Sequence, residues 1–311
     1  MKNILELNTL PEEYGAARAA EASHLVENHS EMHRAERAFV TGLLMQYQPK
    51  KILELGVSAG GGSVIILNAI KDMPDAKLYS VDLFENYYRD KSKPSGWMVD
   101  EFVPELKSKW TAYLGKDAVQ VMDDITSTSP GIPPVQVIDF VVLDTAHIHP
   151  VETINFLCAL PYLRDGAVVV LHDISLHLTK GGYATASDAC RLLFDCVVAD
   201  KITPKEKYAN FPNIGAFQVG PDTRKYVYNM FSSLYLPWAK LYAKPWWELV
   251  PKQLIGEYAQ AFERYYGAEY KEMFLGAVEA QDELYKNISF VSYIQILCGQ
   301  FIRAVVKLGR T

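Results

Sequence analysis

Residues 51–63 read KILELGVSAGGGS, an apolar stretch that runs into a glycine-rich turn. The first six residues have the character of a buried strand, and the residues after the turn continue with the pattern of an apolar helix. Glycine at position 56 and again at 60–62 lets a backbone pass close to a ligand, and the N–H groups at the start of a helix bind polar or anionic atoms. A glycine after a strand can also simply make a turn, so this stretch predicts a nucleotide-type cofactor site only together with other residues.

Strand and helix patterns alternate from residue 51 to about residue 219. Nearly continuous apolar runs at 137–143 and 167–171 predict central strands that are buried on both faces. This alternation predicts an α/β fold with a doubly wound, mainly parallel Rossmann-like sheet. The expected strands are 51–56, 77–82, 118–122, 137–143, 166–172, 197–203 and 214–219, and the expected helices are 11–28, 31–47, 62–71, 99–114, 150–160 and 184–196.

The chain divides into three expected parts. Residues 1–48 predict N-terminal helices that cover the cofactor end of the sheet, residues 49–220 contain the sheet, and residues 221–311 predict a helical extension rich in aromatic residues. Aromatic side chains at helical spacing favour a core or an interface between copies of the chain, so a homo-oligomer formed through the C-terminal helices is one expectation. A pocket wall for an acceptor molecule is the alternative.

Composition restricts the class of protein. The chain has 311 residues, of which 49% are hydrophobic and 22% are charged, as in ordinary globular proteins. A net charge of −6 argues against a nucleic-acid partner, because duplex binding needs a basic face. No C-x-x-C spacing occurs, which favours reduced cysteines over disulfides or zinc ligands; they are Cys158, Cys190, Cys196 and Cys298.

Nothing in the sequence predicts export or membrane insertion. The N-terminus lacks a positively charged region followed by an apolar run, so we expect no signal peptide. The most apolar long segment, 290–308, is interrupted by polar residues and predicts a buried amphipathic helix rather than a membrane span. We therefore expect a cytoplasmic protein with no membrane partner.

The second expected strand ends in Asp82, whose carboxylate can accept hydrogen bonds from both hydroxyls of a ribose. A helix cap or a solvated side chain is the alternative for Asp82 alone. Open α/β sheets bind ligands at the carboxyl ends of their strands, so Asp82 and the glycine turn together predict a nucleoside pocket. The dinucleotide fingerprint G-x-G-x-x-G would need glycine at position 58, where Ser58 stands, and the pattern therefore disfavours a pyrophosphate.

Two more expected strands end in acidic and histidine residues. Asp144 follows the strand 137–143, and the pair His172 and Asp173 ends the strand after the next crossover. If these strands are neighbours, the side chains converge above the sheet, and their carboxylate oxygens suit Mg²⁺ or another divalent cation better than Zn²⁺. His147 lies three residues beyond Asp144 and can take the proton of an alcohol, the alternative being a cap on the helix that follows Pro150.

The G-x-x-x-G-G-G turn at 56–62, with Glu54 before it and Asp82 after the next strand, resembles class I S-adenosylmethionine-dependent methyltransferases. In that family the glycine turn passes the amino-acid part of the cofactor, and the acid at the end of the second strand holds the ribose. The resemblance implies that an aspartate after 118–122 lies near the adenine, either Asp124 or Asp123, each of which can alternatively cap a helix. It implies these cofactor-binding residues: Glu54, Gly56, Gly60, Ser63, Asp82 and Asp124.

The order of Asp144 and His147, followed by His172-Asp173, is similar to the metal-dependent O-methyltransferases of the CmcI-like and macrolide-sugar methyltransferase group. This resemblance covers about residues 30–220. It implies S-adenosylmethionine-dependent methylation of a hydroxyl on a small molecule or sugar, with His147 as catalytic base and a divalent cation held by Asp144, His172 and Asp173. Several relatives have Glu-Asp where this chain has His172-Asp173, which lowers the local negative charge.

Other functions fit the same residues. A methyltransferase without a metal would use His147 alone, and a nicotinamide-dependent oxidoreductase is disfavoured by Ser58. A non-catalytic binding or assembly protein would use the aromatic extension as its interface. The polar segment 84–97 is either a lid or acceptor loop or a surface excursion, and His29, His33 and Glu36 either border the cofactor or, as we expect, form a solvated helix face.

Overall fold

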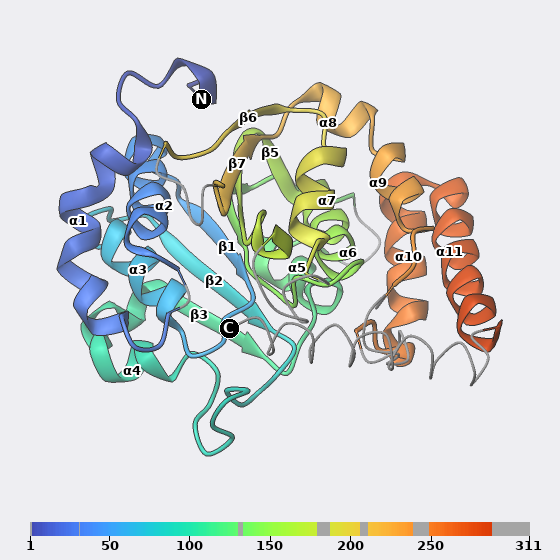
Figure 1. Ribbon diagram of the computed structural model, residues 1–311, viewed down its shortest axis with the longest axis horizontal. Helices are drawn as coiled ribbons and strands as arrows, with labels where there is room; N and C mark the ends of the chain where they lie inside the picture. Colours follow the sequence, from blue (N-terminus) through green and yellow to red (C-terminus); the bar gives the residue numbers. More distant parts are fainter. Residues whose placement is uncertain are drawn as a thin grey trace, which may run out of the picture.

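The computed structural model describes residues 2–30, 32–129, 133–178, 187–205, 211–238 and 249–287. These residues contain a seven-stranded sheet with the order β3-β2-β1-β4-β5-β7-β6 (Figure 1). The strands are β1 Lys51–Leu55, β2 Lys77–Asp82, β3 Trp110–Leu114, β4 Ile138–Leu143, β5 Leu163–His172, β6 Asp200–Ile202 and β7 Ile214–Gln218. The expected α/β fold with a mainly parallel, Rossmann-like sheet is confirmed.

The sheet is parallel from β3 through β5, whereas β7 runs antiparallel to both β5 and β6. The strand order reverses between β1 and β4, which is the position where open α/β sheets form a crevice for ligands. Leu55 pairs with Val81 on one side and with Leu143 on the other. This register brings the residues that follow the three strands to one edge of the sheet.

Helices cover both faces of the sheet (Figure 1). Ile52 packs among residues of α2, α3 and α4, while Leu53, which points to the opposite face, packs among residues of α5, α6 and α7. The helices are α1 Pro11–Val26, α2 Arg34–Tyr47, α3 Gly61–Ile70, α4 Trp97–Phe102, α5 Ala118–Thr126, α6 Val151–Ala159 and α7 Ala189–Cys196. The hydrophobic core on the α5–α7 face, which contains Leu53, thus continues outward from the sheet toward the C-terminal helices.

The C-terminal helices pack against the α5–α7 side of the sheet (Figure 1). They are α8 Pro221–Lys225, α9 Tyr228–Ser233, α10 Ile255–Tyr266 and α11 Ala268–Asn287. Phe231, Phe262 and Phe274 are fully buried, so aromatic residues of this part form core, whereas Tyr228 and Tyr235 are about half exposed. The division of the chain at residues 48 and 220 stays a prediction, as does an oligomer formed through these helices.

Two expected elements around residue 110 are wrong. The helix expected over 99–114 ends at Phe102, and a 3-10 helix, Pro104–Lys109, leads into β3. Proline has no N–H for a helical hydrogen bond, which explains the early end. The strand expected over 118–122 is the helix α5, because Asp117 caps its N-terminus and its buried residues recur at helical spacing: Ala118, Val121, Met122 and Ile125.

Three of the four cysteines lie in the described ranges, and Cys158, Cys190 and Cys196 are free thiols. Cys298 and the segment 290–308 lie outside the described residues. Among the described helices, none is long and apolar enough to cross a membrane.

Candidate active site

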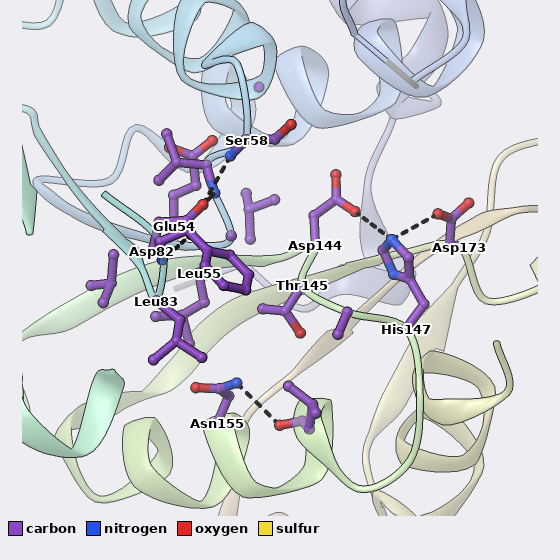
Figure 2. A pocket seen from close by; sticks show the side chains of 18 of the residues that line it. Glu54, Leu55, Ser58, Asp82, Leu83, Asp144, Thr145, His147, Asn155 and Asp173 are labelled. Atoms are coloured by element: carbon purple, nitrogen blue, oxygen red, sulfur yellow. Dashed lines mark hydrogen bonds and ion pairs between the residues drawn. The ribbon is translucent and has the colours of Figure 1, made fainter. Parts of the chain in front are cut away.

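A cavity of about 960 Å³ opens at the carboxyl ends of β1, β2 and β4 (Figure 2). Its walls come from the glycine turn, the ends of β2 and β3, the β4–α6 turn and the C-terminal part of the chain. Of the predicted site residues, six line it: Glu54, Gly56, Asp82, Asp144, His147 and Asp173. The other four, which are Gly60, Ser63, Asp124 and His172, are not part of its lining.

The glycine turn has a backbone that only glycine adopts without strain. Gly56 has φ +92°, and a Cβ there would lie 2.0 Å from the carbonyl oxygen of Asp144. Gly60 has φ +97°, and its Cβ would lie 2.8 Å from the Cα of Gly96. The turn therefore touches two other segments closely, and α3 starts directly after it.

Asp82 ties this turn to the end of β2. Its Oδ2 accepts hydrogen bonds from the backbone N–H groups of Val57 and Ser58, each at 2.9 Å (Figure 2). Its Oδ1 accepts from the N–H of Phe84 at 2.8 Å. A carboxylate has about four lone-pair sites, so one site on Oδ1 is left for a ligand hydroxyl.

Glu54 lies beneath the turn and is 2% exposed. One of its oxygens accepts hydrogen bonds from the hydroxyls of Ser63 and Ser80, both at 2.6 Å. Burial raises the pKa of Glu54 to about 7, and the two hydroxyls oppose this rise only in part. Ser63, expected at the cofactor, thus contacts Glu54 instead of the cavity.

The aspartate expected at the end of the third strand does not line the cavity, because the segment expected to form that strand is the helix α5. Asp124 lies within α5, and its neighbour Asp123 is engaged by Tyr162 and Arg264. Asp117, which follows β3 and caps α5, lines the cavity instead. Burial raises the pKa of Asp117, and Tyr258 from α10 hydrogen-bonds to its side chain.

At the other end of the cavity, β4 and β5 bring two carboxylates and an imidazole together (Figure 2). The Nε2 atom of His147 lies 3.2 Å from Oδ2 of Asp173 and 3.6 Å from Oδ1 of Asp144. Potential ligand atoms of these three residues all lie within 4.8 Å of one another. The expectation that the β4 and β5 ends converge is therefore met by the geometry.

His172 occupies a different place from the one expected. It is 1% exposed, with Nδ1 3.2 Å from Oδ1 of Asp144 and Nε2 3.2 Å from Oε2 of Glu36. Burial acts to lower the pKa of His172, but the carboxylates of Asp144, Asp173 and Glu36 outweigh it and raise the pKa well above its usual value. Both ring nitrogens of the buried His172 therefore face carboxylates of the protein, and the ring is not an open ligand.

Burial acts to raise the pKa of Asp144, yet His172 outweighs this effect and lowers it. Asp144 stays ionised next to the cavity as a result. Glu36 is buried, with 4% exposure, so the expected solvated helix face is wrong for this residue. His29 and His33 line the cavity as well.

Three further polar residues support the site without a recognisable sequence signal. Asn213, from just before β7, donates to Oδ1 of Asp173 at 2.7 Å. Glu152 accepts the backbone N–H of His147 at 2.6 Å, and Glu36 reaches His172 from 136 positions away. Only Glu36 has a local pattern, a capping box with His33, and this pattern predicts a helix start rather than a site residue.

The segment after β2 forms part of the wall. Leu83, Phe84, Tyr88 and Arg89 line the cavity, and Ser95 donates its N–H to the carbonyl of Glu85 at 2.8 Å. The segment is thus a folded loop at the mouth of the cavity. Whether it acts as a lid stays a prediction.

Residues 53–174 match the family model described as a methyltransferase domain. These residues therefore resemble a methyltransferase domain. The match confirms the expected resemblance to methyltransferases, and the matched residues run from β1 through β5 and include residues from both ends of the cavity. No curated protein matches the chain.

The chain is also similar to solved structures. They include the O-methyltransferase TomG from Streptomyces achromogenes, with 17% identity over 68% of this chain and 100% of that chain and a TM-score of 0.45. An O-methyltransferase from Bacillus cereus has 14% identity over 70% and 94% of the two chains and a TM-score of 0.43. The methyltransferase MycE of the mycinamycin pathway has 16% identity over 66% and 55%, with a TM-score of 0.42.

Proposed function

We propose that the protein is an S-adenosylmethionine-dependent O-methyltransferase that acts on a hydroxyl group of a small molecule or sugar. One observation carries this proposal. A single cavity joins a nucleoside-type half, built by the glycine turn, Asp82 and Asp117, to a half that holds Asp144, His147 and Asp173. A methyl donor and an oxygen nucleophile need such adjacent places, because transfer requires the two reactants in line and in contact.

In the donor half, the chain binds and orients. The remaining lone pair of Asp82 would accept from a ribose hydroxyl, and Asp117 at the end of β3 would face the base. The glycine turn, which has no side chain at Gly56, would let the backbone pass close to the amino-acid part of the cofactor. When bound, S-adenosylmethionine supplies an electrophilic methyl group on a sulfonium.

In the acceptor half, Asp144 and Asp173 would hold a divalent cation. Two carboxylates with a histidine nitrogen within 4.8 Å fit such an ion, and hard cations such as Mg²⁺ prefer the oxygens. The cation would position a hydroxyl and ease the loss of its proton. The positive charge of His172 behind this pair reduces the local negative charge, and we place it there as a counter-charge rather than a ligand.

His147 would receive the proton of the acceptor. Nε2 is the ring nitrogen that faces the two carboxylates, and with the carboxylate oxygens bound to an oxygen-preferring cation it would be the nitrogen that accepts the proton. Asn213 fixes Asp173 from the opposite side, so the carboxylate keeps its place while the proton moves.

Calorimetric titration with S-adenosylmethionine and with NAD tests the proposal. We expect the wild type to bind S-adenosylmethionine and not NAD. Asp82→Ala removes charge-assisted hydrogen bonds worth about 1.5–3 kcal/mol, so its affinity should fall about 10- to 100-fold. Asp75→Ala, at an exposed aspartate that pairs with Lys50, is the matched control. A wild type that binds NAD or fails to bind S-adenosylmethionine contradicts the proposal.

The same preparation tests the cation. After dialysis against EDTA, methyl transfer to a panel of hydroxylated small molecules should fall and return with Mg²⁺ or Mn²⁺, while S-adenosylmethionine binding persists. Unchanged turnover after complete chelation would contradict the proposed divalent cation, but not the methyltransferase activity.

A further inference from the structure

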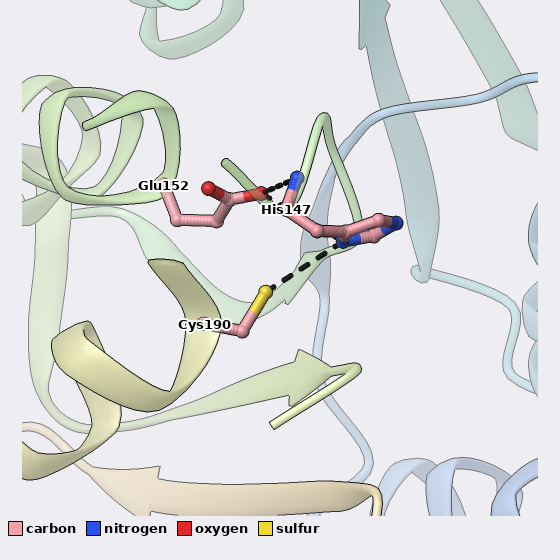
Figure 3. A group of neighbouring side chains, drawn as sticks. All are labelled: His147, Glu152 and Cys190. Atoms are coloured by element: carbon pink, nitrogen blue, oxygen red, sulfur yellow. Dashed lines mark hydrogen bonds and ion pairs between the residues drawn. The ribbon is translucent and has the colours of Figure 1, made fainter. Parts of the chain in front are cut away.

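Each polar atom of His147 lies close to a neighbouring polar group, and Figure 3 shows two of these contacts, to Glu152 and to Cys190. Its backbone N–H donates to Oε1 of Glu152 at 2.6 Å, and its carbonyl accepts from the N–H of Ala189 at 3.2 Å. Its Nδ1 lies 3.7 Å from Sγ of Cys190. The opposite ring nitrogen, Nε2, faces Asp173 and Asp144. The imidazole therefore has one side toward the cavity carboxylates and one side toward α6 and α7.

The backbone at His147 is strained, with φ +59°. A residue with a side chain in the left-handed region needs support from its surroundings, at a cost of about 1–3 kcal/mol. Glu152 gives this support, since Oε1 also accepts the hydroxyl of Thr145 at 2.8 Å. One carboxylate oxygen thus accepts hydrogen bonds from two donors of the same turn and stabilises the conformation of this turn.

Glu152 acts on the backbone of this turn as a hydrogen-bond acceptor, and it makes no hydrogen bond to the imidazole, which lies within ion-pair distance of it. Its Oε1 lies 3.8 Å from Nδ1 of His147, beyond hydrogen-bond distance. Burial raises the pKa of Glu152, and burial also raises that of Cys190 well above its usual value. A thiol that keeps its proton is a poor metal ligand, and Oε1 of Glu152 already accepts two hydrogen bonds. We therefore interpret Glu152 and Cys190 as the residues that hold His147 in place, and not as part of a second cation site with it.

We infer that Glu152 is a positioning residue, which together with Cys190 fixes the His147 ring so that Nε2 lies between Asp144 and Asp173. The role assigned to His147 in methyl transfer rests on the proposed function. The placement of the ring does not, because it is argued from the contacts of Glu152 and Cys190 and not from any reaction.

Glu152→Met and Glu152→Gln separate this role from a general effect on folding. Methionine has a similar length but accepts no comparable hydrogen bond, whereas the amide oxygen of glutamine can accept from both Thr145 and His147. Thr153→Val is the matched control, because Thr153 is the next residue of α6, is fully buried and has no hydrogen-bond partner for its hydroxyl. Thermal unfolding and S-adenosylmethionine titration establish that each variant is folded and binds the donor.

The decisive measurement is nitrogen NMR of histidine-labelled protein without metal, with His147 assigned by a His147→Asn variant. In the wild type we expect one sharp pair of ring nitrogen signals, from a ring in one orientation. Glu152→Met should shift or broaden this pair, while Glu152→Gln and Thr153→Val should keep it. Methyl transfer should fall on the order of 100-fold in Glu152→Met, in kcat rather than KM, as for a displaced catalytic group.

His147 signals that are the same in Glu152→Met and in the wild type would overturn the inference. His147 signals that change equally in Glu152→Gln and in Glu152→Met would overturn it as well. Neither result depends on the proposed function, because the NMR experiment contains no donor, acceptor or metal. If the protein shows the expected NMR changes but binds no S-adenosylmethionine, the positioning role of Glu152 is supported and the methyltransferase assignment is wrong.

Discussion

Glu54 combines deep burial with short hydrogen bonds at the base of the donor half. Its carboxyl group accepts from Ser63 and Ser80, and Trp110 in turn donates to the hydroxyl of Ser80 at 2.8 Å. This chain links β1, β2 and β3 below the cavity floor. The protonation of Glu54 therefore affects the stability of the whole strand edge.

We expect the stability of the wild type to fall between about pH 4.5 and pH 7 because of this group. The pKa of Glu54 rises from 4.5 to about 7 on folding, so the folded state binds the proton more tightly than the unfolded chain. The stabilisation is fully present below pH 4.5 and is lost as the pH rises through 7. At about 1.4 kcal/mol per pH unit, the loss is on the order of 3 kcal/mol.

Urea unfolding at a series of pH values measures this effect. Glu54→Gln removes the ionisation, so its free energy of unfolding should decline less than that of the wild type between pH 5 and pH 8. Glu101→Gln, at an exposed position of α4, should follow the wild type. If the curves of Glu54→Gln and wild type run parallel, Glu54 does not titrate in this range.

Individual site residues differ in how far the sequence could predict them. Asp82, Asp144 and Asp173 lie at the ends of predicted strands, and His147 lies three residues beyond Asp144. The sheet places all four at the cavity. The position of His172 depends on Glu36, and that contact joins residues 136 positions apart. Strand ends can be read from a local pattern, whereas the partner of a buried side chain depends on the tertiary packing.

At the scale of elements, the glycine turn shows how one backbone shape joins three segments. It contacts the β4 end at Asp144 and the start of α4 at Gly96, and it is hydrogen-bonded to Asp82. The sequence predicted β1, the turn and α3 because an apolar strand, four glycines and an apolar helix follow in order. It did not predict that the glycine turn also sets the distance between β1 and the segment that joins β4 to α6.

Gly56→Ala should disrupt this spacing. The new Cβ would lie 2.0 Å from the carbonyl oxygen of Asp144, in a backbone with φ +92°, so we expect a loss of stability of at least about 1–3 kcal/mol and a loss of S-adenosylmethionine binding. Gly256→Ala in α10 is the control, because nothing lies within 4 Å of its Cβ. This change should keep binding and raise stability by about 0.5–1 kcal/mol. Donor binding by Gly56→Ala at wild-type affinity would contradict the assigned role of the turn.

The β3 and α5 region shows where local patterns mislead. Val119 and Val121 favour a strand by side-chain type, yet the cap at Asp117 and the spacing of buried residues give a helix. The error moved the expected acid from Asp117 to Asp124. A capping residue followed by Gln120 was the signal that could have located the helix and hence the cavity residue.

At the scale of the whole molecule, the C-terminal helices belong to the cavity wall. Tyr258 of α10 is 3% exposed, lines the cavity and hydrogen-bonds to Asp117, and Leu249 and Val250 line the cavity beside it. The sequence allowed two roles for the aromatic extension, a packing role and a pocket role. The described part of the extension supplies residues to both.

Tyr258→Phe should weaken S-adenosylmethionine binding while the fold persists. A lost net hydrogen bond of about 1 kcal/mol corresponds to about a fivefold higher Kd, because Asp117 then lacks one partner that orients it. Tyr228→Phe, at a half-exposed tyrosine of α9, should leave the Kd unchanged. Calorimetry measures the Kd for S-adenosylmethionine of both variants. Equal affinities would mean that Tyr258 of the C-terminal extension does not contribute to donor binding.

The left-handed backbone at His147 and Asp173 bears on how these positions evolve. Both residues have φ near +60°, where glycine would be accommodated more easily. Selection for stability alone would therefore favour glycine at both positions. A lineage that keeps histidine and aspartate here retains their side-chain chemistry at a cost in stability, and where that chemistry is lost, glycine should replace these two residues first.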